Sequence, residues 1–130
     1  MDSLLILKSS WGIAIHYEVE GLTLFDPADS DTYLIEGALF VKVNKVRLGD
    51  DAFSFLKKGI QHMIPHMENK KVCFHMKQLL FSSCDIQPEG FYYMFIKWFC
   101  ESRGIVMEPI PVFYDKRKNH YVFPELAEKA

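Results

Sequence analysis

The chain has 130 residues, of which 49% are hydrophobic and 15% aromatic, a composition that excludes disorder and predicts one domain with its own core. Its net charge is −2, and its acidic and basic residues are interspersed along the sequence. Nucleic-acid-binding proteins usually have a dominant basic face, so this charge pattern argues against a nucleic-acid partner. The first residues lack a secretory signal pattern, and no apolar run is long enough to cross a bilayer, so we expect a cytoplasmic protein with no membrane segment. The three cysteines are irregularly spaced, so we expect no disulfide framework.

The N-terminal part of the chain is predicted to be rich in strands. Residues 11–19 alternate between large apolar and smaller or polar side chains, which is the period of a half-buried strand. Residues 3–8 favour either a separate strand before it or the first part of one long bent strand, and residues 22–25 favour a short return strand. Residues 33–47 are predicted to form one further long strand, in which Gly37 marks a bulge or a bend.

A first helix is predicted to begin near Asp50 and Asp51, whose carboxylates favour the amides and the dipole of a helix start. Apolar residues then recur at helical spacing as far as Pro65, which ends or kinks the helix. Residues 72–76 favour a strand that continues through residues 79–81 beyond a polar break.

The second predicted helix is aromatic on nearly every side. It begins after Asp85 or Gln87 with Pro88 at the first helical position, and it ends at Gly104, which can adopt the left-handed cap. Its apolar residues form two stripes, because successive residues are rotated by about 100°. The first stripe contains Phe91, Met94, Phe95 and Trp98. The second stripe contains Tyr92, Ile96 and Phe99.

The chain is predicted to end in a hairpin formed by residues 110–114 and 120–123, with a mostly basic loop between them. The order of elements predicts one α+β domain spanning residues 1–130. We expect an antiparallel or mixed sheet with two helices packed on one face and a C-terminal β-hairpin.

A sheet with one helical layer buries only one stripe of each helix. The second stripe of the aromatic helix therefore packs either on the first helix and the chain termini or on a partner protein, where aromatic residues serve as anchors. The loop at residues 26–31 is a solvated turn or an acidic patch that steers a basic partner. The partner-binding residues are accordingly predicted to be Asp26, Asp29, Asp31, Tyr92, Ile96 and Phe99.

Two arrangements suggest chemistry instead. His62, His66, Cys73 and His75 lie within fourteen residues, as metal ligands do, although Pro65 interrupts the helix that would align the first two. Cys84 next to Asp85 could be a nucleophile at a helix start. Ordinary surface histidines and a buried thiol explain the same residues, so we expect no catalytic residue, no metal and no cofactor. The basic hairpin loop with its neighbouring aromatic residues resembles a phosphate-binding tip but is more simply a solvated turn.

The C-terminal third of the chain resembles a known family. Residues 84–90 (CDIQPEG), the helix around Trp98, and residues 114–116 and 119–123 are similar to small bacterial immunity proteins of polymorphic or contact-dependent toxin systems. The resemblance implies a cytoplasmic protein that binds a cognate toxin, commonly a nuclease, and blocks it. Immunity proteins of nucleases are often strongly acidic, whereas this chain carries a net charge of only −2.

The sequence therefore predicts a non-catalytic protein-binding module, an immunity protein that occludes the active site of its toxin. The alternatives are a small cysteine- or metal-dependent enzyme and a homodimeric structural domain.

Overall fold

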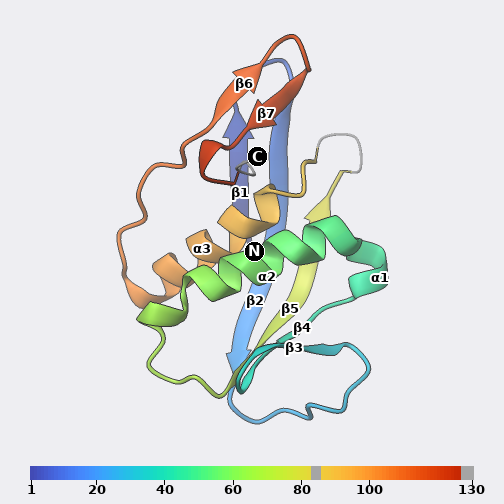
Figure 1. Cartoon of the computed structure of the whole chain (residues 1–130), viewed down its shortest axis with the longest axis vertical. Helices are drawn as coiled ribbons and strands as arrows, with labels where there is room; N and C mark the ends of the chain where they lie inside the picture. The colour runs from blue at the N-terminus through green and yellow to red at the C-terminus, as the bar shows by residue number, and fades with distance from the viewer. Residues whose placement is uncertain (83–85, 127–130) are drawn as a thin grey trace.

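A five-stranded mixed sheet is the centre of the fold in the computed structural model, which describes residues 1–82 and 86–126 (Figure 1). Its strands are β1 (Asp2–Leu7), β2 (Gly12–Leu22), β3 (Thr32–Glu36), β4 (Leu39–Lys42) and β5 (Val72–Phe81). They follow the order β1-β2-β5-β4-β3 across the sheet. The β4 and β5 strands run parallel, and the other neighbouring pairs run antiparallel.

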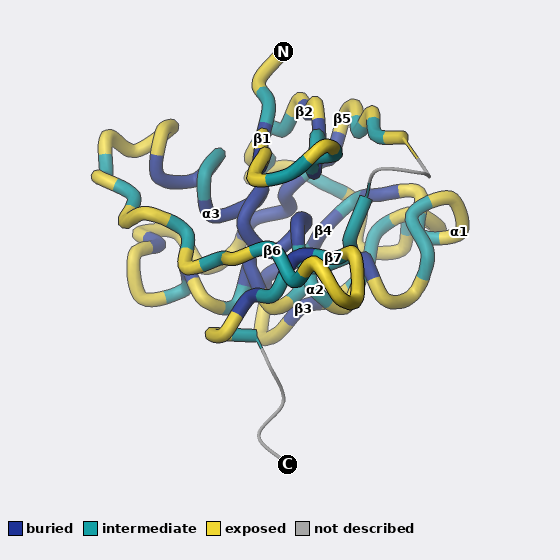
Figure 2. The backbone as a smooth tube through the Cα atoms, turned by 90° about the horizontal axis from the view of Figure 1, so that it is seen from above, coloured by how far each residue is buried: buried dark blue, intermediate teal, exposed yellow. Residues whose placement is uncertain are grey.

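Two long helices cover one face of this sheet. The remaining elements are α1 (Lys45–Leu48), α2 (Asp50–His62), the 3-10 turn η1 (Ile64–His66), α3 (Gly90–Arg103), β6 (Phe113–Asp115), β7 (His120–Val122) and the 3-10 turn η2 (Pro124–Leu126). Figures 1 and 2 show α2 and α3 side by side on the same side of β1, β2 and β5. The predicted α+β class, the mixed sheet and the C-terminal hairpin are confirmed. No described helix has the length and apolarity that crossing a membrane requires.

The alternation predicted for residues 11–19 is confirmed in β2. Ile13, Ile15 and Tyr17 are buried under the helices, whereas His16 and Glu18 are exposed on the other face. The pairing between β2 and β5 shifts by a bulge between Glu18 and Val19, where the two strands no longer match residue for residue. The core therefore lies between the sheet and the two helices.

The hydroxyl of Tyr17 is buried in that core without a hydrogen-bond partner among the described residues. Burial, together with the nearby Glu101 and Asp2 carboxylates, raises the pKa of this phenol far above its usual range. Tyr17→Phe removes an unsatisfied polar group and keeps the ring, so we expect the free energy of unfolding to stay unchanged or to rise by up to about 1 kcal/mol. Urea unfolding checks this expectation, and a loss of stability above that size would contradict the buried, unpaired hydroxyl.

The single long strand predicted for residues 33–47 is wrong. The segment forms β3, a tight turn, β4 and then the short helix α1, and Gly37 adopts a φ of 59° in the turn. A left-handed residue at this point reverses the chain, and glycine adopts it without steric cost. The bend that Gly37 predicted is thus a complete reversal. The return strand predicted at residues 22–25 does not form either, because β2 itself runs on to Leu22 and an irregular loop follows.

The ends of α3 differ in how well the sequence predicts them. Pro88 and Glu89 form a turn before the helix, so α3 begins at Gly90, two residues later than predicted. The other end is as predicted, because Gly104 has a left-handed φ of 66° and its N–H bonds to the carbonyl of Cys100. The alternative start directly after Asp85 is wrong, because Ile86 and Gln87 are described and are not helical, although Asp85 itself lies outside the described residues.

The C-terminal hairpin is fastened to the rest of the molecule through Tyr121. Its hydroxyl donates to the carbonyl of Trp11 at 2.7 Å and accepts from the backbone N–H of Lys8 at 2.8 Å. The Gln87 side chain holds the backbone of Tyr121 at both N–H and carbonyl, at 2.6 and 2.9 Å. The hairpin therefore connects the β1–β2 turn to the segment that leads into α3.

Candidate functional site

The second stripe of α3 is part of the core. Tyr92 is 7% exposed, Ile96 8% and Phe99 0%. The prediction that these three residues form an exposed partner-binding surface is therefore wrong, because the chain's own residues enclose them.

Phe99 packs on the sheet against Phe74 of β5, and two further parts of the chain enclose the stripe. One is α2, whose Gly59 lies so close to α3 that an added Cβ atom would be 2.7 Å from the carbonyl oxygen of Tyr92. The other is the irregular segment that follows α3, where Ile105, Met107 and Ile110 pack on the core. Tyr92 and Ile96 share a cavity of about 560 Å³ with this segment. Helical periodicity predicted the stripe correctly, but not the irregular segment that covers it.

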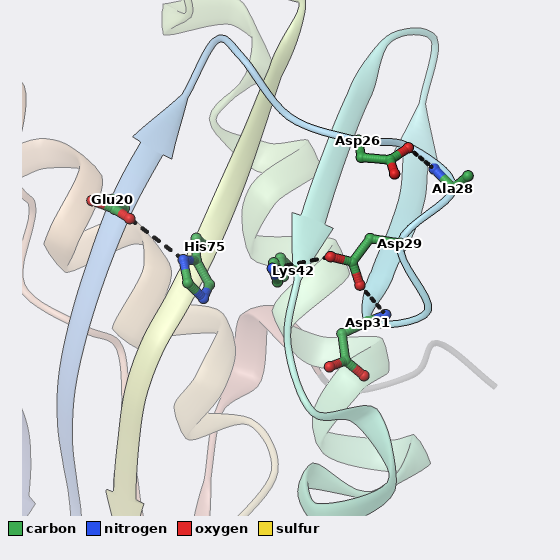
Figure 3. A network of polar contacts seen from close by, with 7 residues as sticks. All are labelled: Glu20, Asp26, Ala28, Asp29, Asp31, Lys42 and His75. Carbon is green, nitrogen blue, oxygen red and sulfur yellow. Dashed lines mark hydrogen bonds and ion pairs between the residues drawn. The ribbon is translucent and has the colours of Figure 1, made fainter.

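Two aspartates of the acidic loop at residues 26–31 form hydrogen bonds or an ion pair with other residues of the chain (Figure 3). Asp26 accepts from the backbone N–H of Ala28 at 2.9 Å, and Asp29 accepts from that of Asp31 at 3.1 Å. Asp29 also pairs with Lys42 on β4 at 3.1 Å. These bonds are those of a self-stabilised turn. For the Asp31 carboxylate, no hydrogen bond or ion pair is found with any described residue.

The Asp29–Lys42 pair predicts a pH dependence. The N–H of Asp31, and after it the Lys42 ammonium, hold the pKa of the Asp29 carboxyl below its usual value. A lowered folded-state pKa stabilises the fold fully above the unfolded-state value of about 3.9, and this contribution is lost as the pH falls through the folded-state pKa. We expect Asp29→Asn to be less stable than the wild type near neutral pH and to match it in strong acid. Thermal unfolding of both proteins from pH 7 to pH 2 measures this, and a difference independent of pH would contradict it.

The four residues considered as metal ligands lie on different sides of the fold. His62 and His66 line the cavity beside α3, whereas His75 faces the opposite side of the sheet, where its Nδ1 is 3.4 Å from a Glu20 oxygen. Cys73 is fully buried, and burial raises the pKa of its thiol. Within residues 1–82 and 86–126, no group of three or more potential ligands is placed to hold a metal ion. Cys84, the candidate nucleophile, lies outside the described residues.

The aromatic residues near the basic hairpin loop are mostly engaged. Tyr121 and Phe123 are buried, and Tyr114 packs edge-on against the rings of Tyr121 and Trp11. Phe113 is exposed. The rings that suggested base stacking therefore hold the hairpin in place.

No described helix covers the other face of the sheet. We call it the open face. The strand register places four exposed leucines on it, where Leu5 is 66% exposed, Leu7 72%, Leu34 55% and Leu80 41%. A solvent-facing antiparallel sheet usually carries polar residues, so exposed leucines on several strands indicate a surface that another molecule covers.

Polar residues cross the middle of the open face (Figure 3). Glu20 on β2, His75 on β5 and Lys42 on β4 occupy neighbouring positions in the register, and Asp29 reaches Lys42 from the acidic loop. Lys77 adds a cation 3.9 Å from both Glu18 and Glu20. Both signs are therefore present, with apolar residues at either end of the face. This pattern suits a protein surface better than a single charged ligand.

Sequence reasoning missed the open face, although a signal for it exists. The first strand reads Ser3-Leu4-Leu5-Ile6-Leu7, so both of its faces are apolar at an edge of the sheet. In a sheet with helices on one side, only one of those faces is buried, and Leu4 and Ile6 occupy it. A strand whose side chains are apolar on both faces, instead of alternating between apolar and polar, indicates that the face not covered by the helices is also apolar.

Comparison with known proteins adds no identification: no family model matches the chain, and neither the curated proteins nor the solved structures include a significant match.

Proposed function

We propose that this protein is a non-catalytic binding module that recognises another protein through the open face of its sheet. The observation that carries the proposal is the set of exposed leucines on β1, β3 and β5, which the register brings onto the face that no described helix covers. Apolar side chains grouped around a polar centre are typical of protein interfaces.

The specific form of the proposal is an immunity protein that neutralises a cognate bacterial toxin from within the cytoplasm. The resemblance of residues 84–90, the helix around Trp98, and residues 114–116 and 119–123 to such proteins supports this form. The mechanism is occlusion: the open face covers the active site of the toxin, and the adjoining acidic loop, where Asp31 has no hydrogen bond or ion pair with a described residue, contacts basic residues around that site. A homodimer closed by the same face is the second candidate, because the exposed leucines would serve it equally well.

The test is co-purification with the product of the reading frame adjacent to the gene, followed by measurement of affinity for variants. Leu5→Lys places a charge on the open face at a position where the side chain is mostly exposed, so the fold tolerates it. We expect about tenfold or greater weakening of the complex, because the charge must be desolvated in the interface.

Val106→Lys is the matched control, since Val106 is a 91% exposed apolar residue in the segment after α3 and away from the open face. It should leave the affinity within about twofold. Equal effects of the two substitutions would contradict the open face as the interface. A complex that forms only between copies of this chain, measured by light scattering across a dilution series, would favour the homodimer.

A further inference from the structure

One edge of β5 has no pairing partner among the described strands over half its length. On one side, β5 pairs with β2 from Cys73 to Phe81. On the other side it pairs with β4 only from Val72 to His75, because β4 ends at Lys42 and the chain turns away into α1. From Lys77 to Phe81, no described strand pairs with the outer edge of β5. The unpaired N–H and C=O groups along a strand edge can pair with a further strand, and here the edge belongs to the central strand of the sheet.

A groove follows this edge. Its volume is about 330 Å³, and its lining outside β5 comes from the two residues between β4 and α1 and from α1 itself. The lining residues outside β5 are Val43, Asn44, Arg47 and Leu48. Val43 is buried and Leu48 is half-buried, so the groove has an apolar base. An extended chain placed here would occupy the line that β4 vacates and would lie in the plane of the sheet.

The charges of the groove are of one sign. Arg47 and Lys77 are the charged residues of its described lining, and both are cationic. Lys77 has carboxylates 3.9 Å away, whereas the guanidinium of Arg47 has no hydrogen bond or ion pair with any described residue. The Arg47 backbone N–H is bound by the Asn44 side chain at 3.1 Å, which fixes the short helix that carries it. The backbone of Arg47 is thus fixed beside the strand edge, and its charge has no partner within residues 1–82 and 86–126.

We propose that the outer edge of β5 binds an extended, acidic segment of the partner protein by strand addition, as a sixth strand between β5 and α1. The inference rests on the proposed protein-binding function and names the chemistry of the segment that is bound. Main-chain hydrogen bonds to residues 77–81 supply the affinity, and alternate apolar side chains lie on Val43 and Leu48. The acidic side chains pair with Arg47 and Lys77. Five residues of β5 span roughly 17 Å, so a segment of six or seven residues fills the site.

The probe that tests this is a capped seven-residue peptide in which valine alternates with glutamate. Titration of the full-length chain should show saturable binding, and amide hydrogen exchange should slow at residues 77–81. The same peptide with alternate amide nitrogens methylated keeps its charge and composition but cannot add as a strand, and it should bind at least about tenfold more weakly. A peptide that binds equally well with methylated nitrogens would overturn strand addition.

Charge variants test the acidic character of the occupant. Arg47→Glu should weaken binding of the glutamate peptide by about tenfold or more and should favour a peptide in which lysine replaces glutamate. Lys116→Glu makes the same charge change in the exposed β6–β7 loop and should leave both peptides unaffected. Loss of affinity of the same size in both variants would overturn the role assigned to Arg47.

The outcomes separate this inference from the proposed function. A partner that binds the wild type and Arg47→Glu equally, and that leaves residues 77–81 unprotected, would overturn strand addition while the open face still stands as an interface. Peptide binding with protection of residues 77–81, in a chain that binds no protein through its open face, would support strand addition and count against the proposed function.

Discussion

Phe99→Ala is expected to lower the free energy of unfolding by about 3–5 kcal/mol, the largest effect we predict for a single substitution. Phe99 is fully buried, its ring centroid lies 6.5 Å from that of Phe74 on β5 and 6.1 Å from that of Phe95, and the Arg103 guanidinium covers it at 4.4 Å. Truncation leaves a cavity between α3 and the sheet that the rigid sheet cannot fill. Urea or thermal unfolding followed by circular dichroism measures the loss.

Lys97→Ala is the matched control on the same helix. Lys97 is partly exposed and forms an ion pair with Glu101 at 2.6 Å, the i,i+4 spacing at which a helix surface pair contributes a few tenths of a kcal/mol. The control should therefore change stability by less than about 0.5 kcal/mol. If Phe99→Ala also changed stability this little, the second stripe of α3 would be a surface after all. If Phe99→Ala does not fold, the milder Phe99→Leu should still show a clear loss of stability.

Gly59→Ala is expected to destabilise the fold by about 1–3 kcal/mol, even though alanine favours an isolated helix by about 1 kcal/mol over glycine. An alanine Cβ at this position would meet the backbone of Tyr92, with its carbonyl oxygen at 2.7 Å and its Cα at 3.2 Å. Because the obstacle is backbone, no side chain can rotate away. The two helices must separate, and the packing over the second stripe is lost with them.

Ser54→Ala on the exposed side of α2 is the control for Gly59→Ala, because it tests the helix preference without a close approach. It should be neutral or slightly stabilising. Thermal unfolding of both variants compares the two positions. A Gly59→Ala protein as stable as the wild type would show that α2 and α3 do not approach as closely as the structure describes.

The strand and helix periodicities predicted most of the fold. The alternation of β2, the aspartates that begin α2 and the glycine cap of α3 are local signals, and each of them marks its element in the structure. The chain reversal at Gly37 was missed because the apolar residues on either side of it, Leu34-Ile35 and Leu39-Phe40, run on as a strand would. Local pattern does not distinguish a kinked strand from a hairpin when the turn is two residues long.

The candidate site was harder to predict because it depends on contacts between distant residues. The count of apolar stripes on α3 was correct, but the burial of Tyr92 and Ile96 depends on the close approach of Gly59 on another helix and on residues 105–111, which have no periodicity. The unpaired edge of β5 arises from the shortness of β4, which only the register reveals. The predicted acidic residues Asp26, Asp29 and Asp31 lie beside the open face. The predicted aromatic and apolar residues Tyr92, Ile96 and Phe99 are buried on the opposite side of the sheet, which the helices cover.

Amide hydrogen exchange of this chain, free and in complex with the product of the adjacent reading frame, tests most directly where a partner is bound. We predict that exchange slows in β1, in the exposed parts of β2 and β5, and in the loop at residues 23–31. Protection confined to residues 105–111 and to the β6–β7 loop, with β1 and β5 unchanged, would show that the uncovered side of the sheet is not where this protein meets its partner.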